Sequence, residues 1–159
     1  MAVDHDERAP LAPERTQPGY VAQLEPHLPQ QPLRDAGPGT DQLYWECANH
    51  ALALECSGGN PWGAATCRNK FTDMATPLES RFFHETSEAS FKMRLTRAKA
   101  EEICQKIMEK YEKLIPIDNY GHRIQEVYDM ERIVPRQEYL DQYNRMRDEL
   151  NKLGVEYAY

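Results

Sequence analysis

Two pairs of carboxylate and imidazole side chains stand four residues apart in segments that we expect to be helical. Glu46 precedes His50, and His84 precedes Glu88. Residues four apart share one face of a helix, and a carboxylate beside a histidine is the arrangement that helical bundles use in metal sites. A di-metal bundle needs further inward carboxylates, and the sequence does not supply them. We therefore interpret both histidines as hydrogen-bonded residues at helix surfaces.

Cysteines are the other side chains suited to metal or redox chemistry. The four of them, Cys47, Cys56, Cys67 and Cys104, are 9, 11 and 37 positions apart, which matches neither a CxxC pair nor a zinc-finger spacing. We interpret them as small, buried side chains. A small metal or redox protein stays open as an alternative. Its candidate ligands are Cys47, Cys56, His50 and Glu46.

Composition limits the classes of function. The chain of 159 residues carries a net charge of -7, so phosphate backbones and acidic lipids do not attract it. No apolar run approaches the roughly 18 residues that a membrane helix needs, and the first residues lack the features of a secretory signal. The sequence also lacks the GxGxxG, P-loop, HExxH and GxSxG motifs. We expect a cytoplasmic protein that binds neither nucleic acid nor membrane.

Residues 1–38 differ in composition from the rest. They hold seven of the eleven prolines and no lysine, and their apolar residues follow no period. Such a segment cannot bury enough surface to offset its ordering entropy, so we predict a disordered, proline-rich leader. Its prolines form no regular PxxP array with flanking basic residues, which argues against a proline-rich recognition site.

The pattern becomes helical after residue 39. Thr40 suits the N-cap of a helix whose first turn carries Asp41, and residues 57–59 can end that helix. Its apolar residues leave almost no polar face, and a helix of this kind needs neighbours on several sides. Segment 60–75 shows no period and is predicted to be a loop or a short helix.

Residues 76–79 give the sharpest local signal. Thr76 at the N-cap, Pro77 at the first position and Glu79 at the third predict a capping box. The helix is predicted to continue through residue 93. Its predicted buried residues are Phe82, Phe83, Ala89 and Phe91.

Thr96 is the predicted N-cap of the next helix, which is expected to end before Pro116. Its apolar stripe is Ala100, Ile103, Cys104, Ile107, Met108, Tyr111 and Leu114, and its predicted ion pairs are Glu102–Lys106 and Glu109–Lys113. A short helical turn over 124–129 and an extended segment over 130–134 are predicted to follow.

The closing helix has signals at both ends. Pro135 is predicted in its first turn, with Glu138 after it, and Gly154 is predicted to be a left-handed C-cap. Its stripe is Tyr139, Leu140, Tyr143, Met146, Leu150 and Leu153, and its predicted exposed pairs are Asp141–Arg145 and Asp148–Lys152. No segment predicts a convincing strand, so the fold class is mainly α.

The segments GPGTDQLYWECANHALALECSGG, FTDMATPLESRFFHE, EEICQKIMEKYEKL and IQEVYDMERIVPRQEYLDQYNRMRDELNKLGVEY follow one another in this order. Together they resemble the C-terminal portion of the methylamine:corrinoid protein methyltransferases, most closely the monomethylamine type. The resemblance spans 121 residues, Gly37 to Tyr157. Its most specific residues are Gly37, Pro38, Thr40, Asp41, Glu46, Thr72, Asp73, Thr76, Glu79, Arg81, Tyr111, Glu112, Lys113, Tyr128, Asp129, Pro135, Glu138, Tyr139, Leu153 and Gly154.

The resemblance implies a cytoplasmic enzyme of methylotrophic methanogens or anaerobic bacteria, folded as a (β/α)8 TIM barrel. Members move a methyl group from a methylamine to the cobalt of a corrinoid that a cognate corrinoid protein holds. Their genes contain an in-frame amber codon that is translated as pyrrolysine, and the family implies that this residue binds the amine. Homo-oligomer contacts are implied as well. No residue of this chain matches the family's catalytic motif, so the resemblance assigns no catalytic, cofactor-binding or metal residue, and no cofactor bound directly.

A barrel of this type needs about 250 residues. We therefore expect residues 39–157 to be the last barrel helix and the helical C-terminal extension, in a chain shortened by a frameshift or by an internal start after an amber codon. On this hypothesis the apolar helix faces evolved to pack on a barrel that this chain lacks, and their exposure predicts aggregation. The alternative is a free-standing helical interaction or oligomerisation module without catalysis.

Overall fold

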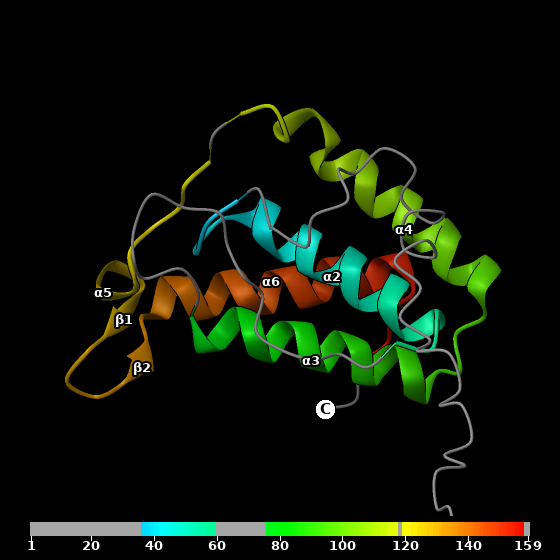
Figure 1. Ribbon diagram of the computed structural model, residues 1–159. Helices are drawn as coiled ribbons and strands as arrows, with labels where there is room; N and C mark the ends of the chain where they lie inside the picture. Colours follow the sequence, from blue (N-terminus) through cyan, green and yellow to red (C-terminus); the bar gives the residue numbers. More distant parts are fainter. Residues whose placement is uncertain (1–35, 60–75, 118, 158–159) are drawn as a thin grey trace, which may run out of the picture.

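The computed structural model describes residues 36–59, 76–117 and 119–157. Within them, four long helices and a small hairpin follow one another along the chain (Figure 1). The mainly α class predicted from the sequence is confirmed. No helix among the described residues has both the length and the apolar character that crossing a membrane needs. The leader predicted over 1–38 lies almost wholly outside the described residues, as do Cys67 and segment 60–75.

Helix α2, Asp41–Cys56, begins and ends where its capping signals predict. The Thr40 hydroxyl accepts a hydrogen bond from the backbone N–H of Leu43 at 3.3 Å. At the other end, Gly58 takes a φ of 74°, which a glycine adopts without the clash that a Cβ would cause. The helix packs against α3, Pro77–Lys92, against α4, Arg97–Tyr111, and against α6, Gln137–Leu153.

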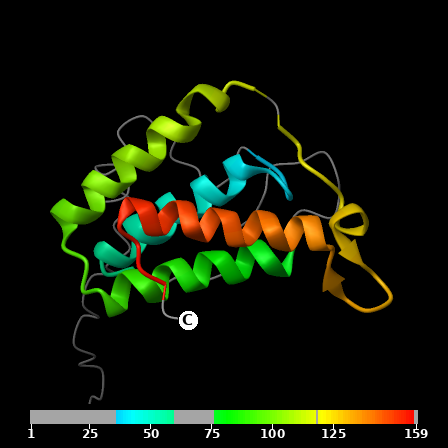
Figure 2. The same cartoon turned by 180° about the vertical axis from the view of Figure 1, so that it is seen from behind.

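The core of the molecule surrounds α2. Seven of its apolar side chains are fully buried: Leu43, Tyr44, Cys47, Ala48, Ala51, Leu52 and Ala53. Figures 1 and 2 show the other three long helices around it, seen from opposite sides. The expectation that this apolar surface lacks partners within the chain is therefore wrong. Helices of the same chain cover it, so the apolar character of α2 is no evidence for a missing barrel.

The helix α3 begins with the predicted capping box of Thr76 and Glu79. Phe82, Phe83 and Ala89 are buried as predicted. Phe91 is 70% exposed, so its assignment to the core is wrong. It lies two residues after Ala89, a rotation of about 200° around the helix that turns its side chain away from that buried residue.

In α4 the buried stripe is confirmed for Ala100, Ile103, Cys104, Ile107 and Tyr111. The α-helix ends earlier than predicted, at Tyr111, and a 3-10 turn, η1, Glu112–Leu114, follows it. The predicted pair of Glu102 and Lys106 forms at 2.6 Å, and Lys99 joins the same carboxylate at 2.8 Å. Leu114 is 38% exposed, because the tighter turn takes it away from the stripe.

Helix α5, Ile124–Val127, leads into strand β1, Tyr128–Asp129, which pairs antiparallel with β2, Val134–Pro135. Residues 130–133 form a turn rather than the predicted extended segment. Pro135 therefore belongs to β2, and its placement in the first turn of α6 is wrong because that helix begins at Gln137 after the N-cap residue Arg136.

The last helix, α6, ends at the predicted left-handed glycine, with a φ of 100° at Gly154. Its buried residues are Tyr139, Tyr143, Met146 and Leu150, as predicted, with Leu140 and Leu153 partly buried. Its predicted exposed ion pairs do not form. Arg145 pairs with Asp41 of α2 at 2.6 Å, and Lys152 pairs with Glu149 at 2.6 Å.

Candidate functional site

The first predicted carboxylate and imidazole pair lies on α2. Glu46 is only 6% exposed. One of its oxygens accepts a hydrogen bond from the Gln42 amide at 2.8 Å, and the other accepts one from the backbone N–H of Ala36 at 3.4 Å. His50 is half-buried, and its ring lies edge-on against the ring of Phe83, with 5.8 Å between centroids. Glu46 therefore holds the chain before α2 in place.

The second pair lies on α3 and faces solvent. His84 is exposed, as the surface interpretation predicts, and its ring lies edge-on to Phe83. Glu88 forms an exposed ion pair with Lys92 at 2.7 Å. An exposed pair of this type contributes little to stability because water competes for both charges.

The predicted burial of cysteines is confirmed for Cys47 and Cys104, while Cys56 is half-buried. The Cys104 thiol donates to the backbone oxygen of Asn49 at 3.8 Å, and the Cys56 thiol donates to that of Leu95 at 3.6 Å. Burial raises the pKa of the Cys56 thiol. Among the described residues, no three His, Cys, Asp or Glu side chains come together as metal ligands. The described residues therefore contain no assembled set of ligands for a metal protein.

Thr76, Glu79, Tyr44, Tyr128 and Tyr139 form a buried acid and tyrosine cluster. Glu79 is fully buried. Its carboxylate accepts hydrogen bonds from the backbone N–H of Thr76 at 3.0 Å, from the Thr76 hydroxyl and from the Tyr139 hydroxyl. The backbone N–H of Gly39 donates to it at 3.3 Å. One carboxylate thus joins the start of α3, the segment before α2, and α6.

Electrostatics in this cluster follow from its burial. Burial raises the pKa of Glu79, and hydrogen bonds from Thr76 and Tyr139 oppose the shift. Burial also raises the pKa values of Tyr44 and Tyr139, and the nearby Glu79 carboxylate raises them further. The two phenols therefore stay neutral and available as hydrogen-bond donors at physiological pH. Because Glu79 and Tyr44 are fully buried, the cluster positions helices and does not present a proton to a substrate.

The capping box identifies Glu79 from the sequence, but only as a local feature. Nothing in the sequence predicts that Tyr139, 60 positions further along, donates to the same carboxylate. Tyr139 appears in the predicted stripe simply as an apolar residue. A buried tyrosine needs a partner for its hydroxyl, and that rule is the one signal that could have pointed to a polar group opposite the stripe.

A small cleft between α3 and α6 holds a second group of charges. It measures about 100 Å³ and is lined by Glu85, Glu88, Ala89, Lys92, Arg147 and Tyr157. The Arg147 guanidinium stacks on the ring of Tyr157, 4.8 Å from its centroid. Burial acts to raise the pKa of Glu85, but hydrogen bonds from Tyr143 and Arg81 outweigh it and hold that pKa below the usual value. Glu85 is therefore ionised, and its charge is neutralised by the nearby guanidinium groups of Arg81 and Arg147.

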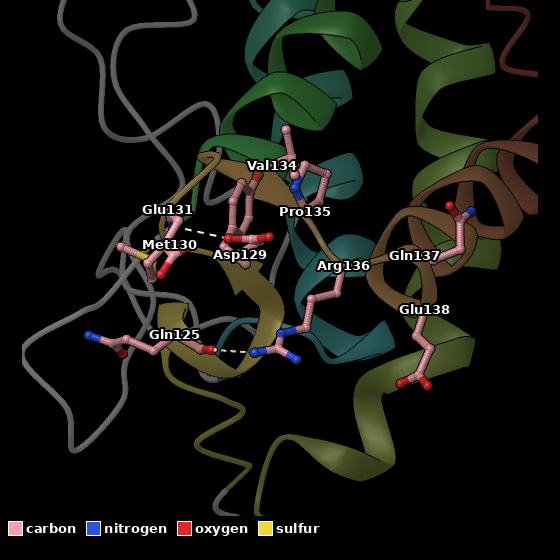
Figure 3. A pocket seen from close by; sticks show the side chains of 10 residues that line it. Gln125, Asp129, Met130, Glu131, Val134, Pro135, Arg136, Gln137 and Glu138 are labelled. Carbon is pink, nitrogen blue, oxygen red and sulfur yellow. Dashed lines mark hydrogen bonds between the residues drawn. The ribbon is translucent and has the colours of Figure 1, made fainter.

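An open groove of about 640 Å³ lies beside the hairpin. Figure 3 shows its lining, which runs from Gln125 of α5 over the hairpin to Gln137 and Glu138 in the first turn of α6. The Arg136 guanidinium donates to the backbone oxygen of Gln125 at 3.2 Å and so ties α5 to the start of α6. The groove combines charged and apolar side chains, and none of its titratable groups is buried apart from Tyr128.

Known proteins resemble this chain over most of its length. The sequence model of the family "Monomethylamine methyltransferase MtmB" matches residues 24–155. Monomethylamine methyltransferase MtmB2 of Methanosarcina acetivorans is 30% identical over 121 residues, and MtmB1 of Methanosarcina barkeri is 28% identical over the same length. These 121 residues are 76% of this chain and 26% of each relative, so the chain spans about a quarter of their length.

Solved structures agree with the sequence match. The crystal structure of the Methanosarcina barkeri monomethylamine methyltransferase superposes with a TM-score of 0.71 at 27% identity. The superposition covers 78% of this chain and 27% of that chain, and the hydroxylamine complex of MtmB gives the same values. The expectation of a mainly α region that matches part of a methyltransferase is confirmed. Since the family model matches most of the sequence, the chain belongs to the MtmB family of monomethylamine methyltransferases.

Proposed function

We propose that this protein serves the transfer of a methyl group from monomethylamine to the cobalt of a corrinoid protein, in the cytoplasm. In this proposal it corresponds to the helical C-terminal portion of a (β/α)8 barrel enzyme. The observation that carries the proposal is the family match over residues 24–155, together with the TM-score of 0.71 against a solved monomethylamine methyltransferase.

The role that the described residues support is structural. A methylammonium ion is a poor methyl donor, so a site must position and activate it and bring a nucleophilic cobalt within reach. The buried acid and tyrosine cluster is closed to solvent and uses its hydrogen bonds to join helices. We therefore assign no catalytic residue here. The corrinoid belongs to the partner protein in this proposal, so we assign no residue to it either.

A methyl-transfer assay tests the proposal. Monomethylamine, a reduced cognate corrinoid protein and the purified chain are incubated, and cobalt methylation is followed by absorbance. We expect no turnover by the chain alone. When a companion polypeptide encoded near it supplies the remaining length of the family protein, we expect turnover that depends on this chain. Dimethylamine serves as the control substrate and should give none.

Two results would contradict parts of the proposal: the first would contradict the supporting role, and the second the link to methyl transfer. Turnover by the chain alone would show that the described residues do more than support a barrel. Failure of every neighbouring reading frame to encode barrel sequence, together with no dependence of methyl transfer on this chain, would remove the methyltransferase role.

The alternative function is a free-standing helical module that binds a partner or oligomerises. The coverage of α2 by α3, α4 and α6 favours it, since a region that closes its own core can fold alone. A protease-resistant chain that unfolds cooperatively and has no effect on methyl transfer by the completed system would support this alternative over the proposal.

A further inference from the structure

The junction of α3 and α4 gathers positive charge in a chain that is otherwise acidic. Residues 91–99, which we call the basic turn, contain none of the 26 acids and four of the 19 lysines and arginines: Lys92, Arg94, Arg97 and Lys99. Without these four charges, the net charge of -7 becomes -11 for the rest of the chain. The basic turn therefore attracts negative charge that the rest of the protein repels.

An aromatic side chain stands beside these charges. Phe91 is 70% exposed, although it belongs to a helix whose other phenylalanines are buried. The arginines of the basic turn are exposed as well. The two lysines form exposed ion pairs, Lys92–Glu88 at 2.7 Å and Lys99–Glu102 at 2.8 Å. Phe91 and Arg94 are therefore the apolar and the charged side chains that this surface offers to a partner.

The backbone of the basic turn is fixed by contacts on its inner side. The backbone N–H of Arg94 donates to the oxygen of Phe91 at 3.0 Å. Leu95 packs against the core, and the Met93 sulfur accepts a hydrogen bond from the backbone N–H of Glu156 at 3.2 Å. Because two side chains anchor the turn, a partner that binds its outer side does not have to order it first.

The identity of residue 94 is unusual for its conformation. Arg94 ends α3 with a φ of 50°, in the left-handed region where glycine is the usual residue because it has no Cβ to clash. The left-handed residues that follow α2 and α6 are glycines, Gly58 and Gly154. Residues in such a conformation gather at sites of binding and function. The arginine at this helix end thus indicates a use for its charge.

Nucleic acids, anionic membranes and acidic polypeptides are the partners that a basic surface attracts. A long phosphate backbone or a lipid surface extends beyond the turn, where it meets a chain with a net charge of -11 and, on α4, Glu101 and Glu102. A short acidic segment stays within the turn. Its carboxylates match the planar fork of a guanidinium, and an apolar residue in it packs on Phe91. The charge distribution therefore favours the polypeptide.

We propose that the basic turn is a docking surface for a short acidic segment of another protein, with carboxylates on Arg94 and an apolar side chain on Phe91. The turn lies between the segments 71–85 and 101–114 that carry the family resemblance, and the resemblance assigns it no role. It also lies at the opposite end of the described region from hairpin 128–135 (Figures 1 and 2). The inference does not rest on the proposed function, because its test needs no methyl transfer.

Fluorescence anisotropy with a labelled peptide of about ten residues, with glutamates on both sides of central leucines, measures the dissociation constant for the full chain. We expect a value of about 10–300 µM at about 50 mM salt, since the surface is small. A peptide with glutamines in place of the glutamates should bind at least about tenfold more weakly. Raising the salt to about 500 mM should weaken binding of the glutamate peptide by a similar factor.

Variants of Arg94 separate binding from folding. Arg94→Glu should raise the dissociation constant at least about tenfold, because it replaces an attraction by a repulsion. Arg94→Gly should also weaken binding, but it relieves the left-handed backbone and should unfold at no lower urea concentration than the wild type. Arg132→Glu is the matched control, because it makes the same change of charge on the distant hairpin, at a side chain that is 80% exposed. It should leave the dissociation constant unchanged.

The proposal is overturned if the glutamate peptide does not bind at about 1 mM protein, or if the glutamine peptide binds equally well. Equal weakening by Arg94→Glu and Arg132→Glu also overturns it, because the attraction would then come from overall charge. Tighter binding of a single-stranded oligonucleotide or of phosphatidylglycerol vesicles than of the peptide overturns it as well, since the turn would then serve a phosphate surface.

Discussion

Replacing Glu79 with alanine removes a side chain that joins three parts of the fold. The carboxylate accepts hydrogen bonds from the backbone N–H groups of Thr76 and Gly39, and from the hydroxyls of Thr76 and Tyr139. After the substitution the two hydroxyls can still hydrogen-bond to each other, because their oxygens lie 2.9 Å apart. The two backbone N–H groups lose their acceptor.

The expected cost follows from those two groups. A buried donor left without a partner costs about 1–3 kcal/mol. Leaving both donors unpaired would cost roughly 2–6 kcal/mol of stability. The cost should lie in the lower part of this range, because the Gly39 contact is longer, at 3.3 Å, and only partly buried. Part of this cost is offset, because the alanine variant no longer has to bury a carboxylate. We therefore expect Glu79→Ala to lower the free energy of unfolding by about 2–4 kcal/mol, a large share of the 5–15 kcal/mol typical of a domain.

Urea unfolding at pH 7, followed by the helical circular dichroism signal, measures the loss. Glu88→Ala is the matched control, because Glu88 lies on the same helix and forms only an exposed ion pair with Lys92. The control should change the free energy of unfolding by less than about 0.5 kcal/mol. If the two variants lose equal stability, the carboxylate does not join the helices as described, and the account of the buried acid and tyrosine cluster is wrong.

Three further predictions concern glycine, charge and pH. Gly121→Ala should cost well over 1 kcal/mol, against about 1 kcal/mol for Gly58→Ala, in chemical denaturation. Both glycines have positive φ, but a Cβ at Gly121 would lie 2.4 Å from neighbouring backbone, whereas one at Gly58 meets nothing within 4 Å. Arg145→Ala should cost less than about 1 kcal/mol, and the loss should shrink in high salt, because its 2.6 Å pair with Asp41 is exposed on both sides. Burial raises the pKa of Glu79 above its ordinary 4.5, so the folded state binds the carboxyl proton more tightly than the unfolded state does. The protonated carboxyl therefore stabilises the fold fully below pH 4.5, and this stabilisation is lost as the pH rises through the raised pKa. The stability advantage of the wild type over Glu79→Gln, measured by denaturation across pH 4–8, should therefore fall with rising pH, and an advantage that grows with pH contradicts the sign.

Local capping signals predicted most of the helix ends, because each depends on a few neighbouring residues, but the end of α4 and the start of α6 were misplaced. Thr40, the capping box at Thr76 and Glu79, Thr96 and Gly154 all occupy the positions that the sequence predicts. Each satisfies backbone groups within one turn of its own helix, so no knowledge of the rest of the fold is needed.

Predictions failed where the outcome depends on neighbours far along the chain. Arg145 was expected to pair with Asp141 on its own helix, but it pairs with Asp41, 104 positions away. The sequence likewise did not predict that α3, α4 and α6 would cover the apolar surface of α2. A pattern of apolar residues shows that a face needs a partner, but it does not identify the partner.

The closed core changes how the family relationship is understood. A region that corresponds to about a quarter of a monomethylamine methyltransferase covers its central helix with its own helices, and joins them through a buried carboxylate. Such a region is expected to fold without the remaining three quarters, whether or not it takes part in methyl transfer. Folding of the isolated chain therefore cannot decide between the methyltransferase proposal and the free-standing module. The dependence of cobalt methylation on this chain decides between them, because only the first requires it.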